Sequence, residues 1–481
     1  MAWRIHLGQK PFVDFTTYVG PVHSYWMAFF FGVFGFGRLA IWACAFSTAA
    51  VAITATYLVI RKEVPAFAAV AALAVTTAGF NWAFSHPFYT HTAQAIGLIA
   101  TAVLILTMRS QNTSRHPNRL RLAWGLCGFA AVVSFLTKPN VGACYGLMFT
   151  LTALLTPKSR LIAVAWTAAG AMTALAAASW WWIADWDLFI RQTILEYGTL
   201  TSSRAVEALT NWHPWTMNYY WIIGLIVLAS CLAKKTFPRP GIFLFCGLYF
   251  IGIFEMATSG AVWESNVPVI GLYLALAYRL LYANTPLKNR TLWRRRITGG
   301  LVCLITCIAI YLTGLFTDYG LKIKQWRTPD RRFKGVSIDP IGTYPLRTAA
   351  LKGWLAEGYQ GRAFDDLADY IRSNIAPSDR LMILTDLSLI NAATGRLPLK
   401  GVPGVWTVDY SPPPGKPVED LRHSFENNPP EWVLTHIGGR LFSGVAFLGD
   451  LIEYLGLERI LEKYYALVFR SGNYIILRRI R

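Results

Sequence analysis

The sequence predicts a polytopic α-helical membrane protein with about ten spans, preceded by an interfacial helix and followed by a small α/β domain. Hydrophobic residues make up 54% of its 481 residues and charged residues only 15%, which is unusual for a soluble globular protein. The apolar residues form long runs, and basic residues fall in the short gaps between them. We therefore ascribe the net charge of +19 to membrane topology and expect no nucleic-acid partner.

The chain opens with an aromatic segment that is too short for a membrane span. A hydrocarbon core about 30 Å thick needs roughly 20 helical residues. Residues 21–35 are apolar and aromatic, but the glycine-rich FGFGR ends the run. We interpret them as an interfacial or re-entrant helix with aromatic rings at the level of the lipid headgroups, with an eleventh span as the alternative.

Long apolar runs then predict the ten membrane spans. The fourth and fifth are short and are joined by TKPN, where Pro139 ends helical geometry, so the pair also fits one interrupted hairpin. The predicted spans are 39–60, 66–84, 93–108, 122–136, 141–155, 161–183, 219–233, 241–257, 267–283 and 298–316.

Lysine and arginine residues predict the orientation of the spans, because short cytoplasmic loops carry an excess of them. The basic set of loops is 61–62, 109–121, 158–160, 234–239 and 288–296. The alternate set, which includes SHPFYTHT, TKPN and the long loop 184–218, carries few basic residues, and we expect it to face outside. Both chain ends then lie outside, so we expect a further span before Met1. We therefore expect the C-terminal domain on the outer side of the membrane.

The composition changes near residue 317, which divides the chain into a transmembrane region, 1–316, and an extracytoplasmic α/β domain, 317–481. AFDDLADYIRSNI (363–375) is helical by the spacing of its apolar residues, and RLMILTD (380–386) has the pattern of a buried strand. EWVLTHI, YALVFRSG and NYIILRR are predicted strands, and the last two form a hairpin around a Ser-Gly turn.

Cysteine placement and motifs exclude several classes of function. All seven cysteines lie in apolar segments, so neither a disulfide framework nor a CxxC metal site is predicted. The chain contains no GxxxxGK[ST] loop, no HExxH and no GxSxG. The predicted cytoplasmic loops are too short to hold a domain for a nucleotide-sugar donor. The motifs therefore predict no cofactor and no metal-binding residue.

Ionisable and aromatic side chains collect on the predicted outer face. Ionisable groups at a membrane boundary are energetically costly, so we treat them as functional candidates. A carboxylate there can take the proton of an acceptor hydroxyl as general base, and a lysine or arginine can balance the charge of a phosphate. Such groups suit a sugar joined to a lipid phosphate. The candidate catalytic residue is Asp14, and the candidate substrate-binding residues are Lys10, Tyr25, His86, His91, Lys138, Arg191, Arg204 and Glu264.

These candidates also have plainer structural explanations. Asp14 fits a cap for the helix that starts near Pro21, and Lys138 lies at a helix break, where a cation can snorkel or pair with free carbonyl groups. His86 and His91 flank a loop that contains Pro87, which is a poor geometry for a metal pair, so a polar lining is the favoured role.

Two segments resemble a known family. GQKPFVDFTTYVGPVHSYWMAFFFGVFGFGRLA (8–40) resembles the opening of bacterial GT-C fold glycosyltransferases, with a G-x-x-P-Y-x-D-F element, a G-P and a lone F-G before an arginine. That group holds the protein mannosyltransferases, the aminoarabinose transferase of lipid A and the RgtA/B/C/D-like enzymes. GLCGFAAVVSFLTKPNVG (125–142) resembles their glycine-rich segment that ends in L-T-K. The likeness extends over nearly the whole chain.

The resemblance implies transfer of a sugar from a polyprenyl-phosphate donor on the outer side of the membrane. It also implies a bacterial inner (plasma) membrane, with the C-terminal domain on the periplasmic side. It also implies a principal acidic motif upstream of the segment matched here, so Asp14 corresponds to a supporting residue and the principal acid is expected to be missing, together with the first span. The family's second acidic position falls in SHPFYTHT, which has histidines and no carboxylate. A divalent metal, as some relatives use, stays compatible with the resemblance but is not predicted.

The leading hypothesis is a glycosyltransferase that acts on a glycan, lipid or protein acceptor of the cell envelope. One rival is a transporter or flippase for a lipid-linked saccharide, which is expected to hold polar groups near the middle of the membrane. Apart from Glu255, the predicted spans contain almost no charged residues near their middle. This scarcity favours chemistry at one face of the membrane over transport through it. The other rival is a catalytically inactive, truncated homologue.

Overall fold

The computed structural model describes a bundle of helices and an α/β unit. The described residues are 1–15, 17, 19–63, 73, 89–110, 117–156, 160–196, 244, 247–248, 250–251, 343–353, 355–384, 389–400, 422–423, 425–436 and 457–480. The predicted boundary near 317 lies outside them, as do the predicted spans 219–233, 267–283 and 298–316 and nearly all of 66–84 and 241–257.

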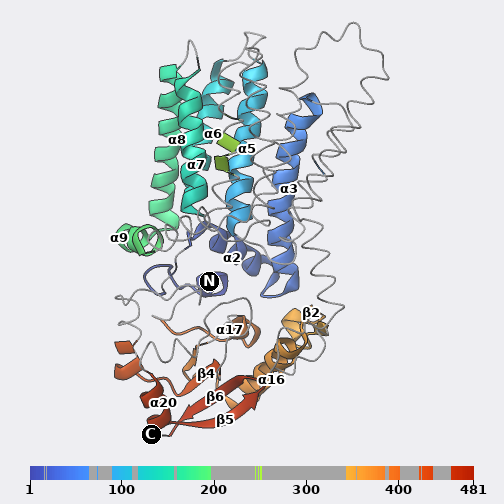
Figure 1. Ribbon diagram of the computed structural model, residues 1–481, viewed down its shortest axis with the longest axis vertical. Helices are drawn as coiled ribbons and strands as arrows, with labels where there is room; N and C mark the ends of the chain where they lie inside the picture. Colours follow the sequence, from blue (N-terminus) through green and yellow to red (C-terminus); the bar gives the residue numbers. More distant parts are fainter. Residues whose placement is uncertain are drawn as a thin grey trace, which may run out of the picture.

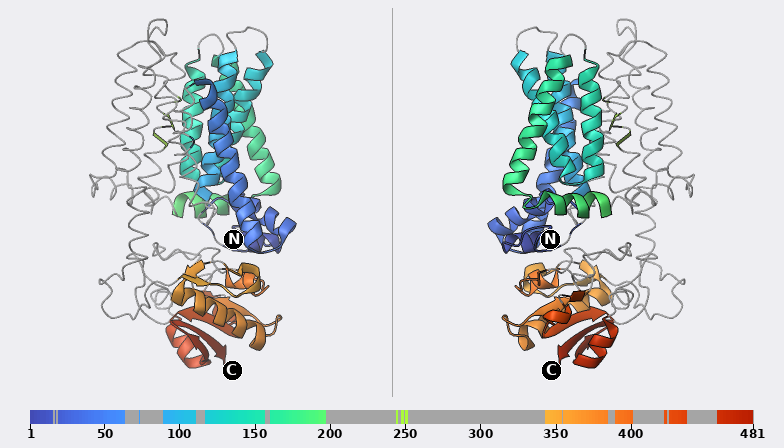
Figure 2. Two further views of the ribbon diagram at one scale, coloured as in Figure 1. Left: turned by 90° about the vertical axis from the view of Figure 1, so that its right-hand side faces the viewer. Right: turned by 90° about the vertical axis from the view of Figure 1, so that its left-hand side faces the viewer.

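Five long helices form the described part of the bundle, and Figures 1 and 2 show them side by side. Five predicted spans are thereby confirmed as helices. Within the described residues, three of them, α3, α5 and α8, are long and apolar enough to cross a membrane. The helices are α3 (Arg38–Glu63), α5 (Tyr89–Ser110), α6 (Pro117–Phe135), α7 (Pro139–Leu154) and α8 (Arg160–Trp181).

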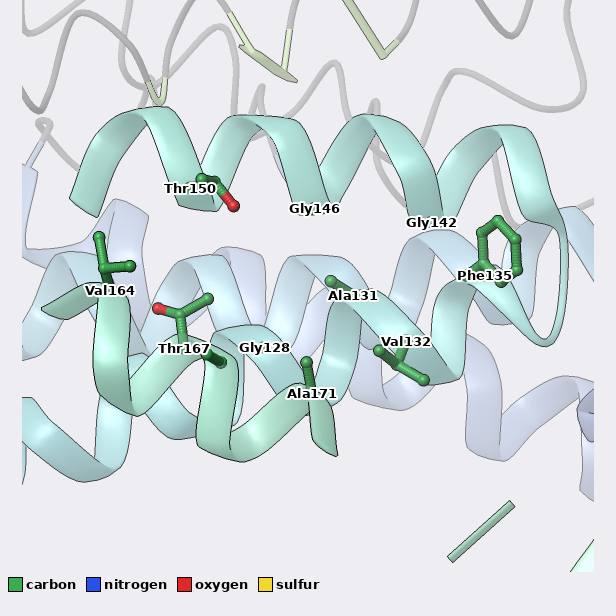
Figure 3. Close-up of a pocket in the computed structure, with 11 residues that line it drawn as sticks. Gly128, Ala131, Val132, Phe135, Gly142, Gly146, Thr150, Val164, Thr167 and Ala171 are labelled. Atoms are coloured by element: carbon green, nitrogen blue, oxygen red, sulfur yellow. The ribbon is translucent and has the colours of Figure 1, made fainter. Parts of the chain in front are cut away.

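Small residues let these helices approach one another closely. A Cβ atom added at Gly128 of α6 would lie 1.8 Å from the backbone oxygen of Thr167, and one added at Gly170 of α8 would lie 1.8 Å from that of Gly125. Such contacts between backbones are typical of helix pairs in membranes. Beside them an apolar groove of about 370 Å³ is open between α7 and α8, where Gly142 and Gly146 face Ala171 (Figure 3).

The described helix ends gather at two ends of the bundle. We call the end that faces the α/β unit the proximal end; it contains the starts of α5 and α7 and the ends of α6 and α8 (Figure 1). The connections that follow α3, α5 and α7 leave from the distal end. The described parts of the predicted basic loops, at the ends of α3 and α5 and at the starts of α6 and α8, thus belong to the distal end, and TKPN belongs to the proximal end, as the alternation predicts.

Shorter helices also lie at the proximal end. A helix is confirmed within the predicted segment 21–35 as α2 (Val22–Phe34), and its 13 residues are fewer than the roughly 20 that a span needs. Within the long loop predicted at 184–218, α9 (Trp186–Phe189) continues into a π-helix, η2 (Ile190–Glu196). Figure 2 shows α9 and η2 running crosswise to the bundle helices. Asp185 caps α9, because its Oδ1 accepts a hydrogen bond of 3.0 Å from the amide of Leu188.

The α/β unit contains a four-stranded sheet in the order β3-β4-β6-β5. Strand β3 (Leu381–Ile383) is parallel to β4 (Trp432–His436), whereas β6 (Tyr474–Arg479) is antiparallel to both β4 and β5 (Tyr465–Ser471). The predicted strands and hairpin are confirmed, and Gly472 supplies the positive φ of +58° that the turn requires. A small second sheet pairs β1 (Thr343–Pro345) with β2 (Leu355–Glu357).

Helices pack around this sheet. The predicted helix 363–375 is confirmed within α16 (Gly358–Asn374), which starts five residues earlier. Other helical elements of the unit include the 3-10 turn η4 (Ala349–Leu351), α17 (Ile390–Ala393) and α20 (Glu458–Tyr464).

The proximal end of the bundle and the α/β unit share one hydrophobic core. Helix α1 (Ala2–His6), α2 and the start of α3 contribute Ala2, Phe31 and Ile41 to it. The α/β unit contributes Leu351 and Phe364, among others. The two regions therefore pack together through apolar side chains and not only through the chain that joins them.

Candidate functional site at the proximal end

The site begins at Lys138, the residue between α6 and α7. Pro139 occupies the first turn of α7, where its fixed φ suits a helix start, and the amide of Lys138 donates to the carbonyl oxygen of Ser134 at 2.7 Å. This tight link turns the lysine side chain toward the start of α5. Its Nζ donates to Thr90 Oγ1 at 3.0 Å and lies 5.4 Å from the centre of the Tyr89 ring. Only 5% of Lys138 is exposed.

Further buried polar side chains lie on the first turn of α5 and on α2. His91 is fully buried beside Thr90. On the next residue along α5, Thr92 Oγ1 lies 2.8 Å from Nδ1 of the buried His23 of α2. We call these five residues, Lys138, Thr90, His91, Thr92 and His23, the Lys138 cluster. It joins α2, α5 and the α6–α7 link in a dense polar region at the boundary of an apolar bundle, which is the setting expected of a functional site.

Asp14 lies elsewhere, in the loop 8–20 that connects α1 to α2. Its Oδ1 forms an ion pair of 2.8 Å with Nζ of Lys400 in the α/β unit, and its Oδ2 accepts a hydrogen bond of 2.8 Å from the amide of Lys10. The hydrogen bond from Lys400 is the main cause that lowers the pKa of Asp14, although burial opposes the shift. The carboxylate is therefore ionised and already engaged with a cation.

The other end of loop 8–20 is fixed to the bundle. Gln192 of the π-helix is buried and binds the loop twice: its Oε1 accepts from the amide of Thr17 at 3.1 Å, and its Nε2 donates to the carbonyl oxygen of Phe12 at 3.3 Å. Gly20 packs directly on the α6–α7 link, because a Cβ there would lie 1.9 Å from the carbonyl oxygen of Leu136. The loop therefore extends from the α/β unit to a point two residues from Lys138.

The structure brings only some of the predicted site residues together. Lys138 contacts Thr90, the residue before His91 on α5, whereas Tyr25 lies half-buried on α2 and Lys10 is exposed on loop 8–20. Arg191 is also exposed and forms an ion pair of 3.3 Å with Asp187, four residues away on the same helical turn. Such a surface pair contributes little to stability. His86, Arg204 and Glu264 lie outside the described residues.

Several residues of the site were not predicted. Thr90 and Thr92 belong to YTHTAQ, whose polar residues at the start of an apolar run are a signal in the sequence. Gln192 and Lys400 carry no comparable signal, since each binds a residue more than 170 positions away. Among the described residues, no group of three or more His, Cys, Asp or Glu side chains is arranged to hold a metal ion.

Comparisons with known proteins find distant structural neighbours. No protein-family model matches the chain, and no curated protein matches it. The oligosaccharyltransferase AglB from Archaeoglobus fulgidus, solved with an inhibitory peptide and a dolichol-phosphate, is 13% identical over 98% of this chain and 69% of its own, with a TM-score of 0.49. ArnT from Cupriavidus metallidurans in the apo state is 15% identical over 97% of this chain and 88% of its own, with a TM-score of 0.48.

A second ArnT structure, bound to undecaprenyl phosphate, is 12% identical over 96% of this chain and 87% of its own, with a TM-score of 0.49. Both proteins are GT-C fold glycosyltransferases.

Proposed function

We propose that this chain is a membrane glycosyltransferase that moves a sugar from a polyprenyl-phosphate-linked donor to a glycan, lipid or protein acceptor of the cell envelope. The observation that carries the proposal is the buried Lys138, within hydrogen-bond distance of Thr90 at the proximal end of the bundle. We further infer that the proximal end faces the periplasm across an inner membrane, because the basic loops belong to the distal end.

Lys138 suits the phosphate of such a donor. An ammonium group buried at a membrane boundary is costly, and a charged phosphate oxygen offsets that cost through a short, strong hydrogen bond. The start of α7 adds the partial positive charge of a helix N-terminus, which also favours an anion. When the bond between the sugar and the phosphate breaks, negative charge builds up on the phosphate oxygen, and the nearby cation stabilises it.

The remaining candidates belong to the surroundings of this phosphate site. His91 is a polar wall of the cluster, and loop 8–20 with Lys10 and Asp14 forms the side that faces the α/β unit. We assign the acceptor to that side, with Tyr25 and Arg191 at its margins, and assign the α/β unit to presenting the acceptor. His86, Arg204 and Glu264 stay sequence-based candidates for the same site. The lipid carrier that we propose is of the class bound in the AglB and ArnT structures.

The direct test is transfer of a labelled sugar from a panel of polyprenyl-phosphate sugars to envelope acceptors by the full chain in lipid nanodiscs. We expect Lys138→Met to lower kcat/KM by about 100-fold, because it removes a charge that stabilises the leaving phosphate. Lys138→Arg should retain part of the activity. Lys463→Met, at an exposed lysine of α20, is the matched control and should leave transfer unchanged.

Two results would count against the proposal. One is sugar transfer that is equal in the wild-type chain and in Lys138→Met. The other is the absence of transfer with every donor, combined with movement of a fluorescent lipid-linked saccharide across vesicles, which is the outcome that a flippase would give.

A further inference from the structure

A short segment of the α/β unit reaches loop 8–20. Residues 396–400, RLPLK, follow α17 after Gly395, whose φ of +70° ends that helix in the left-handed conformation. Every second residue of this segment contacts the N-terminal part of the chain, as the alternation of an extended strand allows. The carbonyl oxygen of Arg396 accepts from Trp3 Nε1 at 3.0 Å, that of Pro398 accepts from Gln9 Nε2 at 2.7 Å, and Lys400 Nζ pairs with Asp14 at 2.8 Å.

The segment is itself held firmly in the α/β unit. The guanidinium of Arg396 is buried and donates to the carbonyl oxygens of Ile375 and Ala376, just after the end of α16. A positive charge at the C-terminus of a helix satisfies free carbonyl groups and complements the helix dipole. Residues 396–400 are therefore positioned by α16, which belongs to the core of the unit.

The three contacts differ in strength. Gln9 is only 4% exposed, so its hydrogen bond to Pro398 is buried and costly to lose. Lys400 is 72% exposed, and exposed ion pairs are weak. Asp14, however, is only 15% exposed, and its carboxylate also accepts the Lys10 amide inside loop 8–20. The buried contact thus attaches the loop, and Lys400 fixes the conformation around Asp14.

We propose that segment 396–400 sets the position of loop 8–20 next to the Lys138 cluster, and that Lys400 is a positioning residue that acts through Asp14. The loop transmits that position, because Gln192 and the contact between Gly20 and Leu136 fix its other end on the bundle. The consequence for sugar transfer rests on the function proposed above. The positioning itself does not.

The test is a double-mutant cycle on the full chain in nanodiscs, followed by hydrogen exchange of the amides in loop 8–20. We expect Lys400→Met and Asp14→Asn each to speed exchange by about two- to five-fold, the effect of losing one partly exposed ion pair. Because the two residues act through each other, the double variant should be no worse than either single variant. Lys400→Arg should restore wild-type exchange, and Lys463→Met is the control.

The same variants are then assayed for sugar transfer. If the chain transfers sugar, Lys400→Met should lower kcat several-fold and leave the donor KM close to that of wild type, since the donor phosphate is bound by the Lys138 cluster. Unchanged loop exchange in Lys400→Met, or additive effects in the double variant, would overturn the positioning role. A wild-type chain without any transfer would overturn the proposed function instead, and the exchange cycle would still decide the role of Lys400.

Discussion

Asp14 and Lys138 show how neighbouring residues determine the role of an ionisable group. Both were candidates because they lie at one predicted membrane boundary. Asp14 is bound by Lys400, whereas Lys138 contacts the Thr90 hydroxyl group and the Tyr89 ring. The sequence pointed to both residues, but it gave no means to find Lys400, which is 386 positions from Asp14. A single sequence contains no signal for such a pair.

The ion pair predicts a pH dependence at this residue. The positively charged groups that interact with the Asp14 carboxylate are Lys400, Lys10 and Arg4. The pKa of Asp14 is lower in the folded chain than its unperturbed value of about 3.9, so its stabilising effect is present above that value and is lost as the pH falls through the folded-state pKa. Asp14→Asn should therefore lower the free energy of unfolding by up to about 1 kcal/mol at neutral pH and have no effect once the pH is well below the folded-state pKa of Asp14. Thermal unfolding of both chains at the two pH values measures this, and an equal difference at both would contradict it.

At the scale of elements, hydrophobic runs predicted five described helices but missed their polar ends. The span predicted at 93–108 begins at Tyr89, and the four residues missed by hydropathy include Thr90 and His91 of the Lys138 cluster. The helix pair α9–η2 was not predicted at all. Its π-helical turn buries the adjacent Gln192 and Thr193 together, a pattern that the usual helical period does not anticipate.

The contact between α6 and α8 gives a prediction for a single helix pair. Gly128→Ala places a methyl group against the rigid backbone of Thr167, so we expect it to destabilise the bundle by about 1–3 kcal/mol. Gly146→Ala is the matched control, because its new Cβ would meet only the Ala131 side chain at 3.9 Å. Thermal unfolding in detergent compares the two. Equal stability of both variants would show that the helices do not approach as closely as described.

At the scale of the whole molecule, the sequence separated a membrane region from an α/β domain, and the structure shows that they share a core. The division rested on composition, which reports where a segment is apolar and not what it packs against. Phe31, for example, belongs to an aromatic run that we expected at the lipid headgroups, yet it is 3% exposed and packs in the core that contains Leu351 and Phe364.

This shared core predicts coupled unfolding. Phe31→Ala should destabilise the protein by about 3–5 kcal/mol and should speed hydrogen exchange in α16 as well as in α2, because it opens the core on both sides. Phe29→Ala, on the same helix but 56% exposed, should have a small effect on both. Faster exchange confined to α2 in Phe31→Ala would indicate that the two regions unfold independently.

The most direct test of the Lys138 cluster as a phosphate site is the binding of polyprenyl phosphate and of the uncharged polyprenol to the wild-type chain and to Lys138→Met. We expect the variant to bind polyprenyl phosphate at least about ten-fold more weakly, since a charge-assisted hydrogen bond is lost. Polyprenol should bind both chains equally, which also shows that the variant is folded. Equal affinity of the two chains for polyprenyl phosphate would contradict the assignment of Lys138.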